Sequence, residues 1–470
     1  MRSEKYITLL FFMFFVVGAL ICTEKTYAAL QENKTYEPKI KVAKVVKPEK
    51  KQAKQVKQEP GNTEAIALLA PKAEQYNFSD EYPLEINGFL DVRYGGRTKK
   101  FENQNDSIAE AIMRVELNQE FEWGYFQIKE DFVGDMVEKK LKAELRQASL
   151  SFSPLEIMDI KVGRQTLTWG TGDLLFINDL FSKDWVSFFI GRDIEYLKKP
   201  SDSIKASIFF ESFDLDFVYT PLFGGSDYIS GERLSYWNPM AAKIAGRDNI
   251  LITQARKDYP DDSEYAMRLS KNINGNEFAL YGYHGFWQTP EGIDPITYKF
   301  IYPRLTAYGA SLRGDILGGI GSLEVGYNDS REDKGNMKPF VRNSEIRFLT
   351  GFEREIKQDF VASVQHYMEY MQDYDEYKSA TGDKSKHEFR QILTLRLTQN
   401  LMNQNLILSW FNYYSPTDRD GYILPGVLYK ASDNLSFEAG CNFFFGKDDH
   451  TFFSAFKNND NVFFAMRYNF

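Results

Sequence analysis

The C-terminal stretch 461–470 reads Asn-Val-Phe-Phe-Ala-Met-Arg-Tyr-Asn-Phe, and its pattern decides the fold. In a β-strand, successive side chains point to opposite faces of the sheet. One face of this stretch is wholly apolar, whereas the other face carries a charge, Arg467. A strand of this kind suits a wall between lipid and water. The apolar positions are Val462, Phe464, Met466, Tyr468 and Phe470.

The same alternation recurs along the chain from residue 83 onward. Near the other end, Leu90, Val92 and Tyr94 alternate with Asp91 and Arg93. We predict about eighteen strands, with an uncertainty of about two. A soluble, secreted all-β protein is the competing interpretation. The candidate strands begin near Leu84, Ala109, Tyr125, Leu141, Ile157, Ser203, Phe213, Glu264, Glu277, Leu305, Gly321, Ser344, Gln358, His387, Asn405, Tyr422, Leu435 and Asn461.

The connections between these candidate strands alternate between short and long. Residues 122–124 and 153–156 are short connections, whereas 170–202 and 221–263 are long ones. Outer-membrane barrels show this asymmetry, with tight periplasmic turns and extended outer loops. We therefore predict an all-β fold: a transmembrane antiparallel up-and-down β-barrel over residues 83–470. An even strand number places both termini in the periplasm, and the terminal Phe470 resembles the assembly signal of such barrels.

The composition agrees with a barrel of this kind. Mean hydropathy is -0.43 and 26% of residues are charged, yet aromatic residues reach 16%. Barrel strands have one lipid face and one wet face, so average hydropathy stays low while aromatic residues line the interfaces. Beyond the N-terminal segment, no apolar run is long enough for a membrane helix.

The N-terminus has the order of a signal peptide, predicted over residues 1–28. Basic residues precede the apolar run 7–22, and cleavage is expected after Ala28 or Ala29. A retained membrane anchor is the alternative. Residues 29–82 are predicted to be a lysine-rich, disordered periplasmic linker, because they hold too little apolar surface to fold alone. The linker is either a solvated spacer or a basic tether for an anionic partner such as the cell wall.

Enzyme chemistry is not expected from this sequence. There are two cysteines, and Cys22 leaves with the signal peptide, so Cys441 has no partner for a disulfide. The four histidines are scattered, and neither His366 nor His387 lies in a recognisable catalytic motif. We predict no catalytic residue, no metal, no cofactor and no nucleic-acid partner.

A long loop, 170–202, follows the strand that ends near Arg164. Arg164 falls on the apolar face, so we expect either a bulge near Gly163 or a position above the membrane. The loop is too apolar for free solvation, and we predict that it folds into the barrel and constricts it. An apolar cap over the rim is the alternative. The expected constriction residues are Leu174, Leu175, Phe176, Asp179, Phe181 and Trp185.

Charged residues of both signs fall on the predicted lumen face. Rings of charge can select ions, and internal ion pairing that fills the wet interior is an equal alternative. The predicted pore-lining residues are Arg93, Arg114, Arg268, Arg313, Arg347, Arg396, Arg467, Glu116, Glu324 and Glu345. Further acids on this face are Asp91, Glu120, Asp131, Asp214, Asp216 and Glu438.

Residues 141–210 resemble a known family. The run Leu145-Arg146-Gln147-Ala148, then Val162-Gly163-Arg164-Gln165 and Trp169-Gly170, is similar to porin-like outer-membrane proteins of the alginate-export type. The resemblance implies a single-chain barrel that passes polymers or small solutes. A lumen with both signs of charge argues against a conduit specific for polyanions.

Two functional hypotheses follow. The first is an outer-membrane channel for passive passage of small hydrophilic or charged solutes, constricted by the loop 170–202. The second is a structural barrel that scaffolds a partner through its linker. That partner would be the cell wall, a periplasmic protein or an electron-transfer protein.

Overall fold

A computed structural model describes residues 84–101, 104–333, 340–382 and 385–470. The predicted signal peptide and the predicted linker lie outside the described residues and stay predictions.

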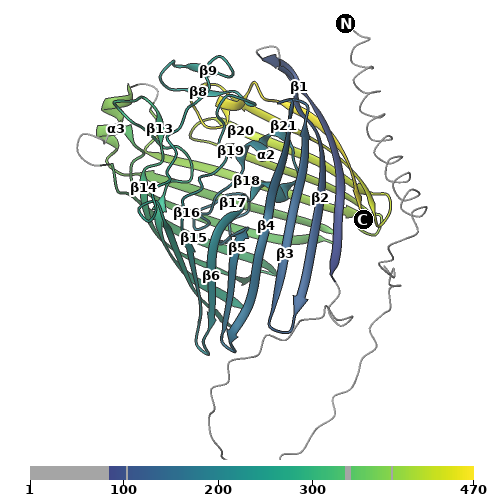
Figure 1. Cartoon of the computed structure of the whole chain (residues 1–470). Coiled ribbons are helices and arrows are strands. Elements are labelled where there is room, and N and C mark those ends of the chain that lie inside the picture. The colour runs from purple at the N-terminus through teal and green to yellow at the C-terminus, as the bar shows by residue number, and fades with distance from the viewer. Residues whose placement is uncertain (1–83, 102–103, 334–339, 383–384) are drawn as a thin grey trace, which may run out of the picture. The chain divides into compact units, whose positions relative to one another are not determined.

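Within the described residues, eighteen strands form one antiparallel sheet that closes on itself (Figure 1). Each barrel strand pairs with the next barrel strand along the chain, and β1 also pairs with β22. Closure leaves no free sheet edge, so the backbone hydrogen bonds of every strand are met within the barrel. The strands are β1 (Glu85–Phe101), β2 (Gln104–Phe121), β3 (Gly124–Asp135), β4 (Lys140–Leu155), β5 (Met158–Gln165), β6 (Ser201–Phe209), β7 (Asp214–Thr220), β10 (Glu264–Ile273), β11 (Asn276–Phe286), β14 (Arg304–Ile316), β15 (Gly319–Ser330), β16 (Glu345–Lys357), β17 (Phe360–Met371), β18 (Phe389–Leu401), β19 (Leu406–Ser415), β20 (Asp420–Lys430), β21 (Leu435–Gly446) and β22 (Asn461–Asn469).

The predicted barrel, its strand number and its antiparallel order are confirmed. Tight turns join the strands at one end, and the long connections gather at the other end, called here the loop end (Figure 1). Short elements within these loops were not predicted from the sequence. They are α2 (Trp185–Ile190), η1 (Ile194–Leu197), β8 (Tyr236–Asn238), β9 (Lys243–Ala245), β12 (Gly292–Ile293), β13 (Phe300–Ile301), α3 (Tyr374–Thr381) and η4 (Ser454–Phe456).

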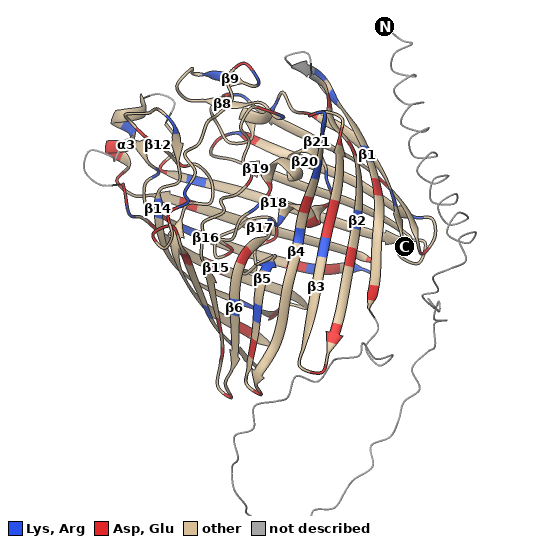
Figure 2. Cartoon of the chain, in the orientation of Figure 1, with Lys and Arg blue, Asp and Glu red and all other residues tan. Residues whose placement is uncertain are grey.

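The two faces of the barrel wall follow the alternation in the sequence. On β22, Phe464 and Tyr468 point outward and are about half exposed, whereas Ala465 is buried on the inner face. On β1, Asp91 and Arg93 face inward and are buried. The outward face is largely apolar and suits contact with lipid. Figure 2 shows that charged residues occur along the strands as well as in the loops.

The bulge predicted near Gly163, which would have turned Arg164 inward, is absent from β5. The pairing of β5 with β4 and with β6 continues without a shift through Gly163, so the expected bulge there is wrong. Arg164 stays on the outward face near the loop end of β5 and binds Asp202 with two hydrogen bonds of 2.7 and 2.6 Å. This bidentate pair neutralises the charge of Arg164, so its side chain is tolerated on the outward face. Glycine at position 163 allows the close approach of β4, because a Cβ there would lie 2.2 Å from the Ala148 carbonyl oxygen.

Helices play a small part in this fold. None of the helices in the described ranges has the length and apolar character needed to span a membrane.

The assignment of inner and outer faces can be tested on β15. Leu323 faces outward and is 44% exposed, whereas the neighbouring Ser322 faces inward. Leu323→Arg should lower the free energy of unfolding from a lipid bilayer by about 2–4 kcal/mol, because arginine is costly at the lipid midplane. Ser322→Arg should cost much less, since its guanidinium points into the wet interior. Urea titration of both variants in phospholipid vesicles measures this difference. Equal losses would contradict the face assignment.

Candidate functional site

The segment 166–200, which joins β5 to β6, lies inside the barrel and is called here the inner loop. Figure 1 shows α2, its helix, within the ring of strands. The inner loop contacts strands on several sides of the wall, through hydrogen bonds to β1, β2, β15 and β19. The loop is therefore ordered against the inner wall and does not lie over the rim as a cap.

Glu324 of β15 holds the first part of the inner loop. Its Oε1 accepts hydrogen bonds from the Thr171 hydroxyl at 2.8 Å and the Gly172 amide at 2.7 Å, and also from the Thr171 amide. Its Oε2 accepts from the Asn178 side-chain amide at 2.9 Å. The Glu324 side chain is almost fully buried, and a buried carboxylate needs several donors to offset its desolvation. Glu324 therefore anchors the loop to the wall.

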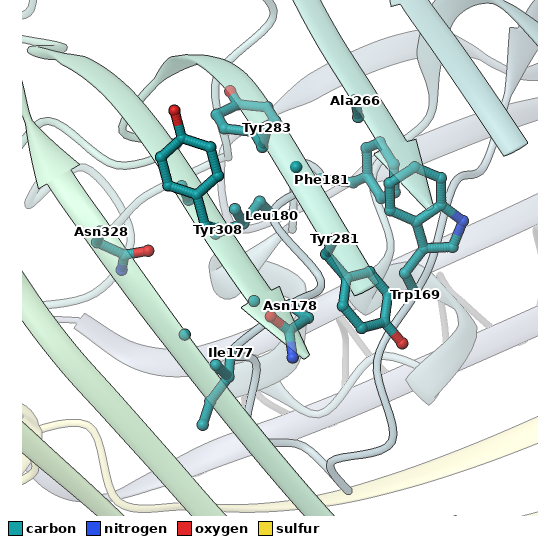
Figure 3. A pocket seen from close by; sticks show the side chains of 14 residues that line it. Trp169, Ile177, Asn178, Leu180, Phe181, Ala266, Tyr281, Tyr283, Tyr308 and Asn328 are labelled. Carbon is teal, nitrogen blue, oxygen red and sulfur yellow. The ribbon is translucent and has the colours of Figure 1, made fainter. Parts of the chain in front are cut away.

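The strands next to Glu324 carry glycine where the inner loop approaches them. A Cβ added to Gly309 would lie 1.7 Å from Asn178 Oδ1, and one added to Gly326 would lie 2.6 Å from Ile177 Cγ2. Glycine at these two positions leaves room for the loop to lie flat on β14 and β15. A small cavity remains between the loop and the wall; Figure 3 shows Ile177, Asn178 and Tyr281 among its lining residues.

The helix α2 packs its aromatic rings against β20, β21 and η4. The Phe189 ring lies 5.4 Å from Tyr422, 5.3 Å from Phe444 and 5.0 Å from Phe456, measured between ring centres. Asp184 caps the helix, because its carboxylate accepts from the Ser187 amide at 2.8 Å. Removing these rings from water stabilises the packed loop by about 25 cal/mol per Å² of buried apolar surface.

Ion pairs and hydrogen bonds tie the second half of the inner loop to β1–β3 and β22. Arg192 Nε lies 2.7 Å from Glu110 of β2, and the Tyr196 hydroxyl donates to Asp131 of β3 at 2.8 Å. Glu195 pairs with Arg114 at 2.9 Å, and Asp193 pairs with Arg467 at 3.0 Å. The inner loop is thus held by aromatic packing against β20 and β21 and by charged groups of the neighbouring strands β22 and β1–β3.

The predicted constriction residues lie within this loop. Leu174, Leu175, Phe176 and Trp185 pack against the aromatic cluster around Tyr422. Phe181 belongs to a second apolar cluster on the wall of β7, β10, β11 and β14. Asp179 is buried and pairs with Lys183 at 2.9 Å. Together these residues reach across the interior from one wall to the other.

The predicted pore-lining residues all face inward, but the loop and the neighbouring strands bring most of them into ion pairs. Arg93 pairs with Asp91, Arg268 with Glu277, Arg347 with Glu345, and Arg396 with Asp173 of the inner loop. Glu116 lies 3.1 Å from Lys129. Arg313 is exposed and forms no ion pair with a described residue. Pairing therefore accounts for most of these charges.

Sequence reasoning missed a row of basic residues on the inner face of β3–β6. The loop leaves part of these side chains uncovered: Lys129, Lys142 and Lys205 keep 28%, 34% and 31% of their surface exposed, comparable to Arg396 of β18 with 36%. By contrast, Arg93 and Arg114 keep 3% and 4%. The alternation in each strand could have placed the row inward, but the sequence does not show which inner side chains the loop would cover. The row consists of Lys129, Lys142, Arg146, Lys161 and Lys205.

One outer loop is joined to the inner loop. Residues 221–263 connect β7 to β10, and Arg233 of this loop lies 2.7 Å from the same Glu110 carboxylate that binds Arg192. The Asp227 amide donates to the Lys183 carbonyl at 2.8 Å, and the Trp185 amide donates to the Asp227 carbonyl at 2.9 Å. The inner loop and residues 221–263 are therefore joined by backbone hydrogen bonds, and both bind Glu110 of β2.

No group of three or more histidine, cysteine, aspartate or glutamate side chains in the described ranges is placed to hold a metal ion. Of the histidines, His284 contacts Thr306 and Arg331, and His366 contacts Gln391.

Comparison with known proteins places this architecture among outer-membrane barrels. No family model matches the chain, and no curated protein matches it in sequence. Among solved structures, OccAB3 of Acinetobacter baumannii matches with a TM-score of 0.52 and 11% identity, over 82% of this chain and 99% of that chain. OccD3 (OpdP) of Pseudomonas aeruginosa matches with a TM-score of 0.49 and 9% identity, over 82% of this chain and 91% of that chain. The likeness to OccAB3 supports a porin-like barrel fold. It gives no support to the alginate-export-type family predicted from residues 141–210.

The anchoring role of Glu324 can be tested by removing its charge. Glu324→Gln should weaken the bonds to Thr171 and Gly172, since a hydrogen bond to a charged group contributes about 1.5–3 kcal/mol. We expect faster hydrogen exchange at these two amides and unchanged exchange in the strands. Asp315→Asn, on the exposed inner face of β14, is the matched control and should change neither. Unchanged exchange in the Glu324 variant would show that the carboxylate does not hold the loop.

Proposed function

We propose that this protein is an outer-membrane channel through which small hydrophilic or charged solutes pass passively. The short turns and both termini would face the periplasm, and the loop end would face outward. In this proposal the inner loop narrows the lumen, and solutes pass beside it along the wall of β3–β6. The observation that carries the proposal is the basic row on that wall, where Lys129, Lys142 and Lys205 keep 28–34% of their side-chain surface exposed.

The arrangement of this row favours a role in transport over a role in stability. Lys161 of β5 and Lys205 of β6 are directly opposite each other in the sheet and both face inward. Like charges in this position destabilise a sheet. Lys205 has Asp216 at 3.2 Å, whereas Lys161 forms no ion pair with a described residue. Lys129 and Lys142 also have partners, Glu116 and Glu138, each at 3.1 Å, so Arg146 and Lys161 are the basic residues of the row without an ion pair to a described residue. Unpaired positive charge on a lumen wall attracts anions and repels cations.

Passive passage requires no chemical step, and the proposal assigns no catalytic residue and no cofactor. The concentration gradient drives the solute, and the protein supplies the wall, the narrowing and the charge. The partners are then the lipid of the outer membrane and the solutes in transit.

The second candidate function is a structural barrel whose linker, residues 29–82, holds a periplasmic partner. The eight lysines between Lys39 and Lys57 motivate it, because such a segment attracts the anionic cell wall or an acidic electron-transfer protein. A barrel that only scaffolds needs no open passage. Single-channel conductance of the purified protein in a planar bilayer separates the two functions, and an absence of ionic current would contradict the channel.

Reversal of charge on the open wall should reverse ion preference. The double variant Lys161→Glu and Lys205→Glu places two carboxylates where two ammonium groups stood. We expect a measurable shift of the reversal potential in a KCl gradient, from the value for anion preference toward the value for cation preference. Lys271→Glu, on the outward face of β10 beside the exposed Phe278, is the matched control and should leave the reversal potential unchanged. If the double variant keeps the parent reversal potential, solutes do not pass along this wall.

Removal of the linker should leave conduction unchanged. A chain without residues 30–80 retains every described strand, so its barrel should insert and conduct as the full chain does. Planar-bilayer recordings of both chains make the comparison. A large change in current would mean that the linker enters the lumen.

A further inference from the structure

A cleft opens at the loop end of the barrel, away from the inner loop. Its walls are the β12–β13 hairpin, the segment 340–343, the end of β17 and the helix α3. Figure 1 shows α3 and β13 at the same corner of the loop end. The cleft has a volume of about 200 Å³. Since one water occupies roughly 30 Å³, this is room for about six waters, or for one sugar ring with its hydroxyl groups.

An unpaired polar atom lies in this cleft. Asn343 lines the cleft and is 2% exposed. Its Nδ2 donates to the carbonyl oxygens of Gln372 at 2.8 Å and Asp373 at 3.3 Å, which fixes the orientation of the amide. Its Oδ1 has no hydrogen-bond partner among the described residues and less than 1 Å² of accessible surface, so a ligand reaches it only when the cleft wall shifts slightly. A buried acceptor without a partner is costly, so this oxygen calls for a donor from a bound molecule.

A second acceptor faces the cleft at Glu291. Its Oε1 is occupied by Arg342 Nη1 at 2.8 Å and the Thr289 hydroxyl at 3.0 Å. Its Oε2 has only the Lys386 ammonium at 3.9 Å, too far for a hydrogen bond. Burial alone would raise the pKa of Glu291, but the charges of Arg342 and Lys386 lower this pKa to about 2. The carboxylate therefore stays an acceptor at any physiological pH.

Donors and an apolar face complete the cleft. The Tyr377 hydroxyl accepts a hydrogen bond from the Lys386 amide at 3.1 Å, so its own proton is free to be donated. The Lys386 side chain is 51% exposed and brings a second donor. Phe340 is 39% exposed and lines the cleft beside the buried Phe300. An exposed ring next to several hydrogen-bonding groups suits a molecule with an apolar face and a polar edge.

The charged groups next to the cleft form one paired network among the described residues. Arg342 is in contact with Glu291, Glu345 and Glu369, and Arg347 pairs with Glu345. With Lys386, the three cations of this network match its three carboxylates. A charged ligand would therefore find no net attraction from this network, whereas an uncharged one with many hydroxyl groups would satisfy the donors and acceptors.

We propose that this cleft is a binding site for a small uncharged sugar of monosaccharide size. The ligand would lay its apolar face on Phe340 and give hydroxyl protons to Asn343 Oδ1 and Glu291 Oε2. Tyr377 and Lys386 would donate to its oxygens. The site is separate from the inner loop, and the proposal does not depend on the barrel being a channel.

The experiment uses the full chain, purified in a detergent without a sugar head group. Saturation-transfer NMR with glucose as the probe reports binding, and titration gives the affinity. Glucuronate and glucosamine, of the same size but charged, are titrated in parallel. We expect glucose to bind and both charged sugars to bind more weakly. Phe340→Ala and Lys386→Met should each weaken glucose binding by about tenfold, and both positions are exposed enough to spare the fold.

Tyr298→Ala is the matched control. Tyr298 is 68% exposed between β12 and β13 but does not line the cleft, so this variant should bind glucose as the parent does. No binding of glucose to the parent would overturn the proposal, as would equal binding in the Phe340 and Lys386 variants. Tighter binding of either charged sugar would overturn the uncharged class. Conductance is measured separately, so a barrel without current that binds glucose would refute the channel and leave this site standing.

Discussion

Closure of the sheet between β1 and β22 is the constraint on which the rest of the structure depends. Within a hydrocarbon layer, every backbone N–H and C=O group needs a partner in the protein, and an open edge would leave a row of them unmet. Once the sheet closes, each strand must present apolar side chains to one side only. The alternation in 461–470 is the direct result. Closure with eighteen strands also encloses an interior that is too wide for wall side chains to fill.

The inner loop fills part of this wide interior. Its apolar residues cannot remain in water at low cost, and the wall offers them aromatic partners at Tyr422 and Phe444. Its polar backbone finds a partner in Glu324, and glycine at positions 309 and 326 lets it approach closely. On the wall of β3–β6, Lys129, Lys142 and Lys205 keep 28–34% of their side-chain surface exposed. The inner loop therefore fills much of the interior, and in the proposed function solutes pass along this wall.

The sequence alone predicted the barrel well because alternation is local. Each strand start lay within a few residues of its observed position, and the terminal strand needed no tertiary information. The loop elements α2 and β8–β9 escaped prediction, since their conformation depends on contacts with distant strands. The bulge predicted near Gly163 was wrong for the same reason: Asp202, the partner of Arg164, lies across the loop, and alternation cannot reveal such a pair. Inward-facing charges were recognised, but pairing partners such as Asp173 for Arg396 required the folded loop.

The central claim is that the inner loop narrows a passage through the barrel. The most direct measurement is single-channel conductance of a variant in which residues 174–189 are replaced by a short glycine–serine linker, recorded beside the full chain. The account predicts that the variant still inserts, that its conductance rises severalfold and that its ion selectivity weakens, because the narrowest part has been removed. If the variant inserts normally and its current and selectivity match those of the parent, the loop does not constrict a passage and the account is contradicted.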